Sequence, residues 1–239
     1  MSFRKVLFFG AAMIFGFAGS ARAQLGVYGM YSGERFTGIT CPTYAAPCGT
    51  NNGTVRPYGA TLGAFYDFMN VGPVRLGVDL RGDLLRADKR ADSSAGGTDV
   101  LRQYATLGGL RGTFRTPKRW LRPYAEITGG YTRNNDVGQY TFTTTTSTAP
   151  VTLSYNPTVN KNYALVKAFV GVDIAIFPFL DLRPIELGEG EAFGSAVYSQ
   201  SVTSNGSTTT TTSTTSGPNT HGNQSISAGI VFHLPRPSR

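Results

Sequence analysis

Residues 74–84 alternate so strictly that one kind of secondary structure is favoured over all others. Every second residue from Val74 to Leu84 is apolar or glycine, and the positions between them hold Arg75, Gly77, Asp79, Arg81 and Asp83. A two-residue period places the two sets on opposite faces of a β-strand, whereas a helix would spread the charges around its circumference. The segment is therefore predicted to be a strand with one apolar and one ionic face.

The same alternation recurs along the chain. It is clear in residues 58–68, 104–114, 121–131, 164–176 and 226–234, although Leu107 does not fit the polar phase of its segment. Residues 25–36 alternate weakly, and their facing cannot be assigned. Residues 180–187 change phase, which a bulge near Arg183 and Pro184 would explain. These segments predict eight strands.

The composition agrees with a β protein. Charged residues make up 15% of the 239, against roughly 25% in an ordinary soluble domain, and the chain contains 30 glycines, 12 tyrosines and 15 phenylalanines. A helical bundle and a charged disordered chain are excluded. The formal charge of +8 is too diffuse to indicate a nucleic-acid partner.

The first 23 residues have the pattern of a secretory signal peptide. A basic start with Arg4 and Lys5 precedes an uncharged apolar run, and Ala21, Arg22 and Ala23 form a small-residue cleavage motif. The alternative is a membrane helix that stays in place, but the run is shorter than the roughly 20 residues such a helix needs. The expected organisation is a signal peptide at 1–23, one β domain at 24–234 and a short extension at 235–239.

Cys41 and Cys48 enclose a short polar stretch. In the oxidising compartment to which a signal peptide leads, they are expected to form a disulfide that closes one loop. A redox or metal pair is the alternative, but it lacks the C-x-x-C spacing and nearby histidines. No metal or cofactor site is predicted.

Strand polarity alone does not decide between a soluble barrel, with its apolar face inward, and a membrane barrel, with that face against lipid. Aromatic residues bracket the apolar face at matched ten-residue separations, Tyr58 with Phe68 and Tyr104 with Phe114. In a tilted strand this separation spans roughly 25 Å, the height of an apolar band between two aromatic girdles. Connections also alternate between short (71–73, 116–120, 178–179) and long (38–55, 87–99, 135–160, 188–223). Together with the signal peptide, these features favour a membrane barrel.

With these features the chain resembles the small outer-membrane β-barrel family, the eight-stranded transmembrane domain of outer-membrane-protein-A-like proteins. The resemblance covers residues 24–234. It rests on the signal peptide, the long and short connections and a set of inward charges, which comprises Arg75, Asp79, Arg81, Asp83, Arg111, Arg122, Glu126, Lys167 and Asp173.

The final strand carries a second part of the resemblance. Its apolar face holds Ile226, Ile230, Phe232 and Leu234, and it looks like the C-terminal strand that the family's assembly machinery reads. Family members commonly end on an aromatic residue, whereas five residues follow here. Members that contain a soluble peptidoglycan-binding domain continue well past the eighth strand, so cell-wall anchoring is not implied.

The resemblance implies an antiparallel up-and-down transmembrane β-barrel with short periplasmic turns and long extracellular loops. It also implies export to an outer membrane of the Gram-negative type, with outer-membrane lipid, periplasmic chaperones and the barrel-assembly machinery as partners. Residues 139–145 and 151–155 are expected to form an extra hairpin above the membrane. If that hairpin entered the membrane, the barrel would have ten strands.

Three classes of function remain. An eight-stranded barrel is just wide enough for its own side chains, so the inward charges are expected to pair across the lumen and close it; a small porin-like channel is the alternative. A lipid-modifying enzyme would need a catalytic histidine, but no motif frames His221 beside Ser225 and Ser227, and His233 lies at the periplasmic end. The Ser/Thr tract at 207–216 is expected to be mobile and hydrated, either as a contact with an extracellular surface or host ligand or as a solvated spacer. A non-enzymatic structural or surface role is preferred.

Overall fold

The computed structural model describes residues 24–39, 53–90, 98–145, 150–204 and 207–234, and for some strand ends it describes the backbone alone. In these residues the chain forms nine β-strands, which are β1 (Gln24–Ile39), β2 (Gly53–Val55), β3 (Tyr58–Val71), β4 (Val74–Arg90), β5 (Thr98–Phe114), β6 (Leu121–Thr145), β7 (Pro150–Phe177), β8 (Leu180–Ser204) and β9 (Ser207–His233). Within the described part of the chain, no helix is long and apolar enough to cross a membrane.

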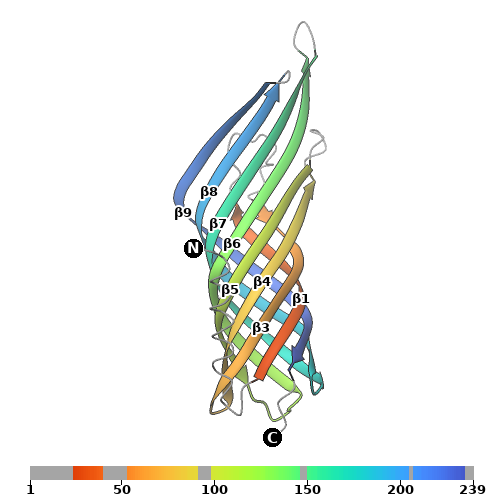
Figure 1. Ribbon diagram of the computed structural model, residues 1–239, viewed down its shortest axis with the longest axis vertical. Helices are drawn as coiled ribbons and strands as arrows, with labels where there is room; N and C mark the ends of the chain where they lie inside the picture. The colour runs from red at the N-terminus through yellow and green to blue at the C-terminus, as the bar shows by residue number, and fades with distance from the viewer. Residues whose placement is uncertain (1–23, 40–52, 91–97, 146–149, 205–206, 235–239) are drawn as a thin grey trace.

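The strands close into a barrel (Figure 1). From β3 to β9 each strand is antiparallel to the next one in the sequence, and β1 pairs with β3 on one side and with β9 on the other. β2 is a three-residue strand that pairs only with the end of β1 and does not belong to the wall. The wall therefore has eight strands, and the predicted antiparallel up-and-down barrel is confirmed.

The two ends of the barrel differ. At one end, called here the short-turn end, β3 and β4 are joined by Gly72 and Pro73, and β7 and β8 by Pro178 and Phe179. Gly72 has a φ of 56°, in the left-handed region that glycine adopts without strain. At the opposite end β6, β7, β8 and β9 extend well beyond the rest of the barrel wall (Figure 1).

This extension corrects the expected loops. Much of 135–160 and 188–223 is strand, and the Ser/Thr tract at 207–216 forms part of β9, where Ser201 pairs with Thr210. The hairpin at 139–145 and 151–155 does form, but as a continuation of β6 and β7, so the ten-strand alternative is wrong. Threonine is β-branched and favours extended backbone, and antiparallel pairing satisfies the backbone groups of these polar segments.

The facing of the side chains follows the predicted alternation in β3 to β9. The structure also assigns the facing of β1, in which Tyr28, Met30 and Glu34 point inward. The pairing of β8 with β9 shifts between Arg183 and Glu186, so the predicted bulge is confirmed. Leu107 is fully buried in the lumen opposite Arg81, where it belongs to an apolar cluster with Leu165 and Phe169 that lies beside the ionic groups.

Candidate functional site

The interior of the barrel is crossed by charged side chains that meet at Arg81. Arg81 on β4 donates to Glu186 of β8 at 2.8 Å and to Glu126 of β6 at 2.9 Å. Its Nε lies 3.4 Å from Asp79, which also accepts a 2.7 Å hydrogen bond from the Tyr28 hydroxyl. Arg81 is only 2% exposed, so its charge is balanced by carboxylates inside the barrel rather than solvated by water.

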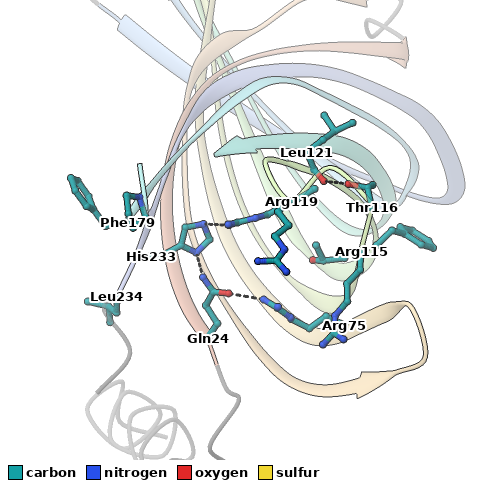
Figure 2. Close-up of a pocket in the computed structure, with 13 residues that line it drawn as sticks. Gln24, Arg75, Arg115, Thr116, Arg119, Leu121, Phe179, His233 and Leu234 are labelled. Atoms are coloured by element: carbon teal, nitrogen blue, oxygen red, sulfur yellow. Dashed lines mark hydrogen bonds between the residues drawn. The ribbon is translucent and has the colours of Figure 1, made fainter. Parts of the chain in front are cut away.

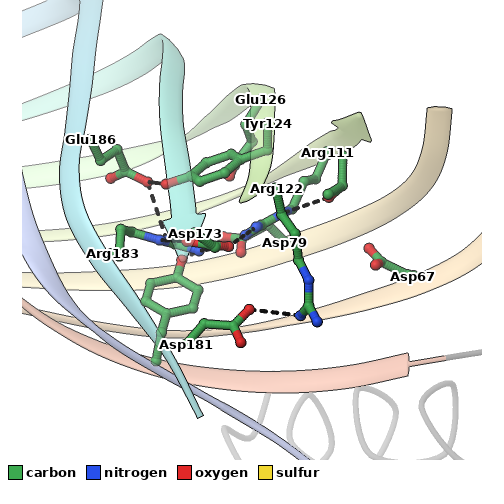
Figure 3. A network of polar contacts seen from close by, with 12 residues as sticks. Asp67, Asp79, Arg111, Arg122, Tyr124, Glu126, Asp173, Asp181, Arg183 and Glu186 are labelled. Atoms are coloured by element: carbon green, nitrogen blue, oxygen red, sulfur yellow. Dashed lines mark hydrogen bonds and ion pairs between the residues drawn. The ribbon is translucent and has the colours of Figure 1, made fainter. Parts of the chain in front are cut away.

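Glu186 connects Arg81 to a second group of ion pairs. Arg183 lies 3.3 Å from Glu186 and donates to Asp173 of β7 from its Nε at 2.7 Å and from its Nη2 at 3.1 Å (Figure 3). The same Asp173 accepts a 2.7 Å bond from Arg111 of β5. The contacts form one continuous chain from Arg81 to Arg111, called here the central network, and it ties together four strands of the wall.

Aromatic rings fill the space between these arginines. The Arg81 guanidinium lies 3.7 Å from the centre of the Phe169 ring. Arg111 lies 3.9 Å from the ring centre of Tyr124 and 4.0 Å from that of Phe65. Arginine stacks well on aromatic faces because its planar cation is weakly hydrated. The lumen at this level is therefore packed by alternating cations and rings.

Glycines directly opposite these rings make room for them. Tyr28 pairs with Gly63 across β1 and β3, and Phe169 pairs with Gly188 across β7 and β8. A Cβ added to Gly63 would lie 2.3 Å from the Tyr28 ring, a distance that real Cβ atoms do not tolerate. Each of these rings thus lies over bare backbone.

A second polar layer lies toward the extended end. Lys167 of β7 and Glu34 of β1 form a 2.5 Å ion pair, and Asn223 donates to Glu34 at 3.1 Å. In the same layer Thr61 donates to Asp83 at 2.6 Å. Farther toward the extended end, Phe36, Ala87 and Leu101 form a buried apolar cluster.

A third layer lies at the short-turn end. Arg122 and His233 both contact Asp181, at 2.7 and 2.8 Å. His233 also bonds to Gln24 at 2.8 Å, and Gln24 accepts a 2.6 Å hydrogen bond from Arg75 (Figure 2). This layer is more accessible to solvent than the central network, because the Arg122 side chain remains 31% exposed.

The nine charges predicted from the sequence all point into the lumen. The structure brings Asp79, Arg81 and Glu126 together, and it joins Arg111 to Asp173. The other four contact residues outside the predicted set: Arg75 pairs with Asp67 and donates to Gln24, Arg122 pairs with Asp181, Lys167 pairs with Glu34, and Asp83 accepts from Thr61.

The sequence reasoning missed five interior charges, which are Glu34, Asp67, Asp181, Arg183 and Glu186. Glu34 lies on β1, whose weak alternation does not assign a facing. Asp181 and Arg183 alternate with Leu180 and Leu182, so a signal was present, but the bulge that follows puts Glu186 out of phase with them.

The described lumen holds more acids than bases. Eight carboxylates face it, those of Glu34, Asp67, Asp79, Asp83, Glu126, Asp173, Asp181 and Glu186, against six bases, Arg75, Arg81, Arg111, Arg122, Lys167 and Arg183. Neutral donors offset the difference: the hydroxyls of Tyr28 and Tyr124 donate to Asp79 and Glu186. Satisfying a buried carboxylate with such bonds is necessary because an unpaired one is costly.

The outer wall is apolar. Tyr58, Phe68, Tyr104 and Phe114 are exposed on it, as are the predicted assembly-strand residues Ile226, Ile230, Phe232 and Leu234. Cys41, Cys48 and the predicted signal peptide lie outside the described residues.

Of the two histidines, only His233 has a described side chain, and the side chain of His221 lies outside the described part of the chain. His233 is engaged by Asp181, and Ser227 is buried on the lumen side. The described part of the chain contains no group of three or more His, Cys, Asp or Glu residues that could hold a metal ion.

A closed antiparallel barrel of eight strands, with charges inside and apolar residues outside, is the fold of the small outer-membrane β-barrels. No family model matches the chain, and no curated protein matches it in sequence.

Solved structures of this kind are similar to it. Neisserial surface protein A is 13% identical with a TM-score of 0.46, over 90% of this chain and 98% of that one. A major outer membrane protein from Thermus thermophilus is 12% identical with a TM-score of 0.47, over 89% and 100%. The outer membrane protein OprG from Pseudomonas aeruginosa is 9% identical with a TM-score of 0.43, over 89% and 96%.

Proposed function

We propose that this protein is an integral outer-membrane barrel whose lumen is closed by its own side chains, and that it acts in envelope structure or surface contact rather than as an enzyme. The observation that carries the proposal is the central network. Arg81, Arg111 and Arg183 are each at most 2% exposed and each reaches at least one carboxylate.

The outer wall supports a lipid environment. Leu62, Leu110 and Ile127 are 58%, 63% and 59% exposed on it. In water each such side chain would forgo about 1.5–3 kcal/mol of burial free energy, whereas lipid provides that burial. A closed barrel also pairs its wall strands with one another, as the hydrocarbon region requires. Outer-membrane lipid, periplasmic chaperones and the assembly machinery are the partners that follow from this proposal.

The packing of the lumen opposes ion flow. An ion that crossed the barrel would have to pass the stacked arginines of the central network and then the apolar cluster of Phe36, Ala87 and Leu101. Breaking a buried ion pair leaves a charge without a partner, which costs about 3–5 kcal/mol. A porin-like channel is therefore the less favoured function.

Recordings in planar lipid bilayers test the closed lumen. The wild-type protein is expected to show only small, infrequent openings. The double variant Arg81→Ala and Phe169→Ala removes a stacked pair and should raise the conductance, while the matched outer-wall variant Arg102→Ala and Phe114→Ala should not. Large, steady currents from the wild-type protein would show that it is a channel.

The extension of β6 to β9 supports a role in surface contact, because it projects beyond the barrel wall at the end opposite the short turns (Figure 1). An epitope inserted between Ser204 and Ser207 should be detected by antibody on intact cells. An epitope detected only after the outer membrane is permeabilised would contradict this orientation. If the tagged protein were found neither in the membrane fraction nor at the cell surface, the outer-membrane location itself would be contradicted.

A further inference from the structure

A cavity of about 850 Å³ opens at the short-turn end of the barrel (Figure 2). Its charged lining consists of Arg75, Arg115, Arg119 and Arg122, with His233 beside them. No carboxylate is among the described residues that line it, although the lumen above is rich in acids.

The positive charge of this cavity is only partly neutralised. Arg122 is paired with Asp181 at 2.7 Å, and Arg75 lies 3.4 Å from Asp67. Arg115 donates to the neutral amide of Asn70. Among the described residues, no carboxylate lies within ion-pair distance of Arg115 or Arg119. Two guanidinium groups at the mouth are therefore available to an anion.

His233 does not compete for that anion. Its Nδ1 is bonded to Gln24 and its Nε2 lies 2.8 Å from Asp181, so both ring nitrogens are already engaged within the barrel. Recognition at the mouth falls to the arginines, whose planar forks match the oxygens of a phosphate group.

The other walls of the cavity are apolar. Leu121, Phe179 and Leu234 contribute to the lining, and Phe179 and Leu234 are also more than half exposed at the outer rim. The volume exceeds the space that an inorganic phosphate needs. The cavity therefore combines cationic groups at its mouth with apolar walls, which suits an anion that carries an organic group.

We propose that this cavity is a binding site for a phosphate ester, with the phosphate held by Arg115 and Arg119 and the organic part against Leu121 and Phe179. The ester comes either from a small soluble molecule or from an anionic phospholipid headgroup at the barrel rim. The inference does not depend on whether the lumen above is closed.

Trp120 provides a local reporter, because it is the single tryptophan of the chain and is adjacent to Arg119 and Leu121. The full protein, purified in neutral detergent, is titrated with glycerol 3-phosphate while its fluorescence is followed. A second titration uses phosphatidylcholine nanodiscs with increasing phosphatidylglycerol, and sodium chloride at matched ionic strength controls for screening. A saturable response to glycerol 3-phosphate identifies a soluble ester, and a response to phosphatidylglycerol alone identifies a headgroup.

The double variant Arg115→Gln and Arg119→Gln should weaken whichever response is seen by about tenfold or more, the effect of losing a charge-assisted contact. Arg102→Gln with Arg133→Gln, which changes two exposed arginines toward the extended end, should leave it unchanged. If the double variant does not fold, Arg119→Gln alone carries the comparison. The proposal is overturned if neither ligand gives a saturable response, if chloride reproduces it, or if the Arg115 and Arg119 variants retain it.

Discussion

The ring of Tyr124 lies over Gly171, its direct partner across β6 and β7, so closely that a Cβ on Gly171 would come within 2.5 Å of the tyrosine oxygen. The position of the ring matters to the whole lumen. Tyr124 donates a 2.5 Å hydrogen bond to Glu186 and stacks against both Arg111 and Arg183. A residue without a side chain therefore fixes a ring on which three charged groups depend.

Gly171→Ala is accordingly expected to lower the free energy of unfolding by roughly 1–3 kcal/mol, the usual cost of overpacking a filled interior. Gly129→Ala is the matched control, because nothing lies within 4 Å of its added Cβ. Urea titration of the protein in lipid, read as the fraction that migrates as the folded form on an unheated gel, provides the measurement. Equal midpoints for the two variants would contradict the close approach of Tyr124.

Asp173 is the shared acceptor of Arg111 and Arg183, so removing it leaves two buried cations short of a partner. Asp173→Ala is expected to lower the free energy of unfolding by about 3–5 kcal/mol. Glu189→Ala removes a carboxylate from the exposed outer side of β8 and should change it by about 0.5 kcal/mol or less. The same unfolding titration measures both. A loss for Asp173→Ala no larger than the control's would mean that the central network contributes little stability.

The extension of β8 and β9 is expected to be dispensable for closing the barrel. β9 pairs with β1 only from Asn223 to His233, whereas the extension pairs β8 with β9 farther from the short-turn end. Replacing residues 196–215 by an Asn-Gly turn should leave a protein that inserts into lipid and migrates as a folded form before heating. If the shortened protein still migrates differently before and after heating, the prediction is supported. If it no longer reaches the membrane, barrel assembly needs the extension.

The disulfide between Cys41 and Cys48 stays a prediction. Mass spectrometry of unreduced protein should find the peptides that contain the two cysteines linked, because export carries them into an oxidising compartment. Cys41→Ser should leave membrane insertion intact, since the connection between β1 and β3 joins strand ends opposite the short turns. Two thiols that react freely with alkylating reagent in the folded protein would refute the link.

The two-residue period determined the strand count and the facing of most strands without reference to any other protein. Arg81 and Asp83 could be placed on one face with Asp79 because a β-strand allows no other arrangement of that alternation. The asymmetry between short and long connections likewise separated the two ends. The sequence predicts loops for the long connections, because Ser/Thr content describes polarity and does not reveal whether two segments pair.

The tertiary structure decided which charge meets which. Arg81 and Glu186 are separated by 105 positions in the sequence and meet only because the barrel closes and brings β4 and β8 to face each other across the lumen. The pairing of each ring with a glycine, as in Tyr124 and Gly171, depends on strand register, which a single sequence does not encode locally. The cavity with Arg115 and Arg119 likewise results from bringing the end of β5, the turn after it and the ends of β7 and β9 to one rim. Local alternation specifies the faces of each strand, whereas closure and register specify the contacts between them, and those contacts carry the site.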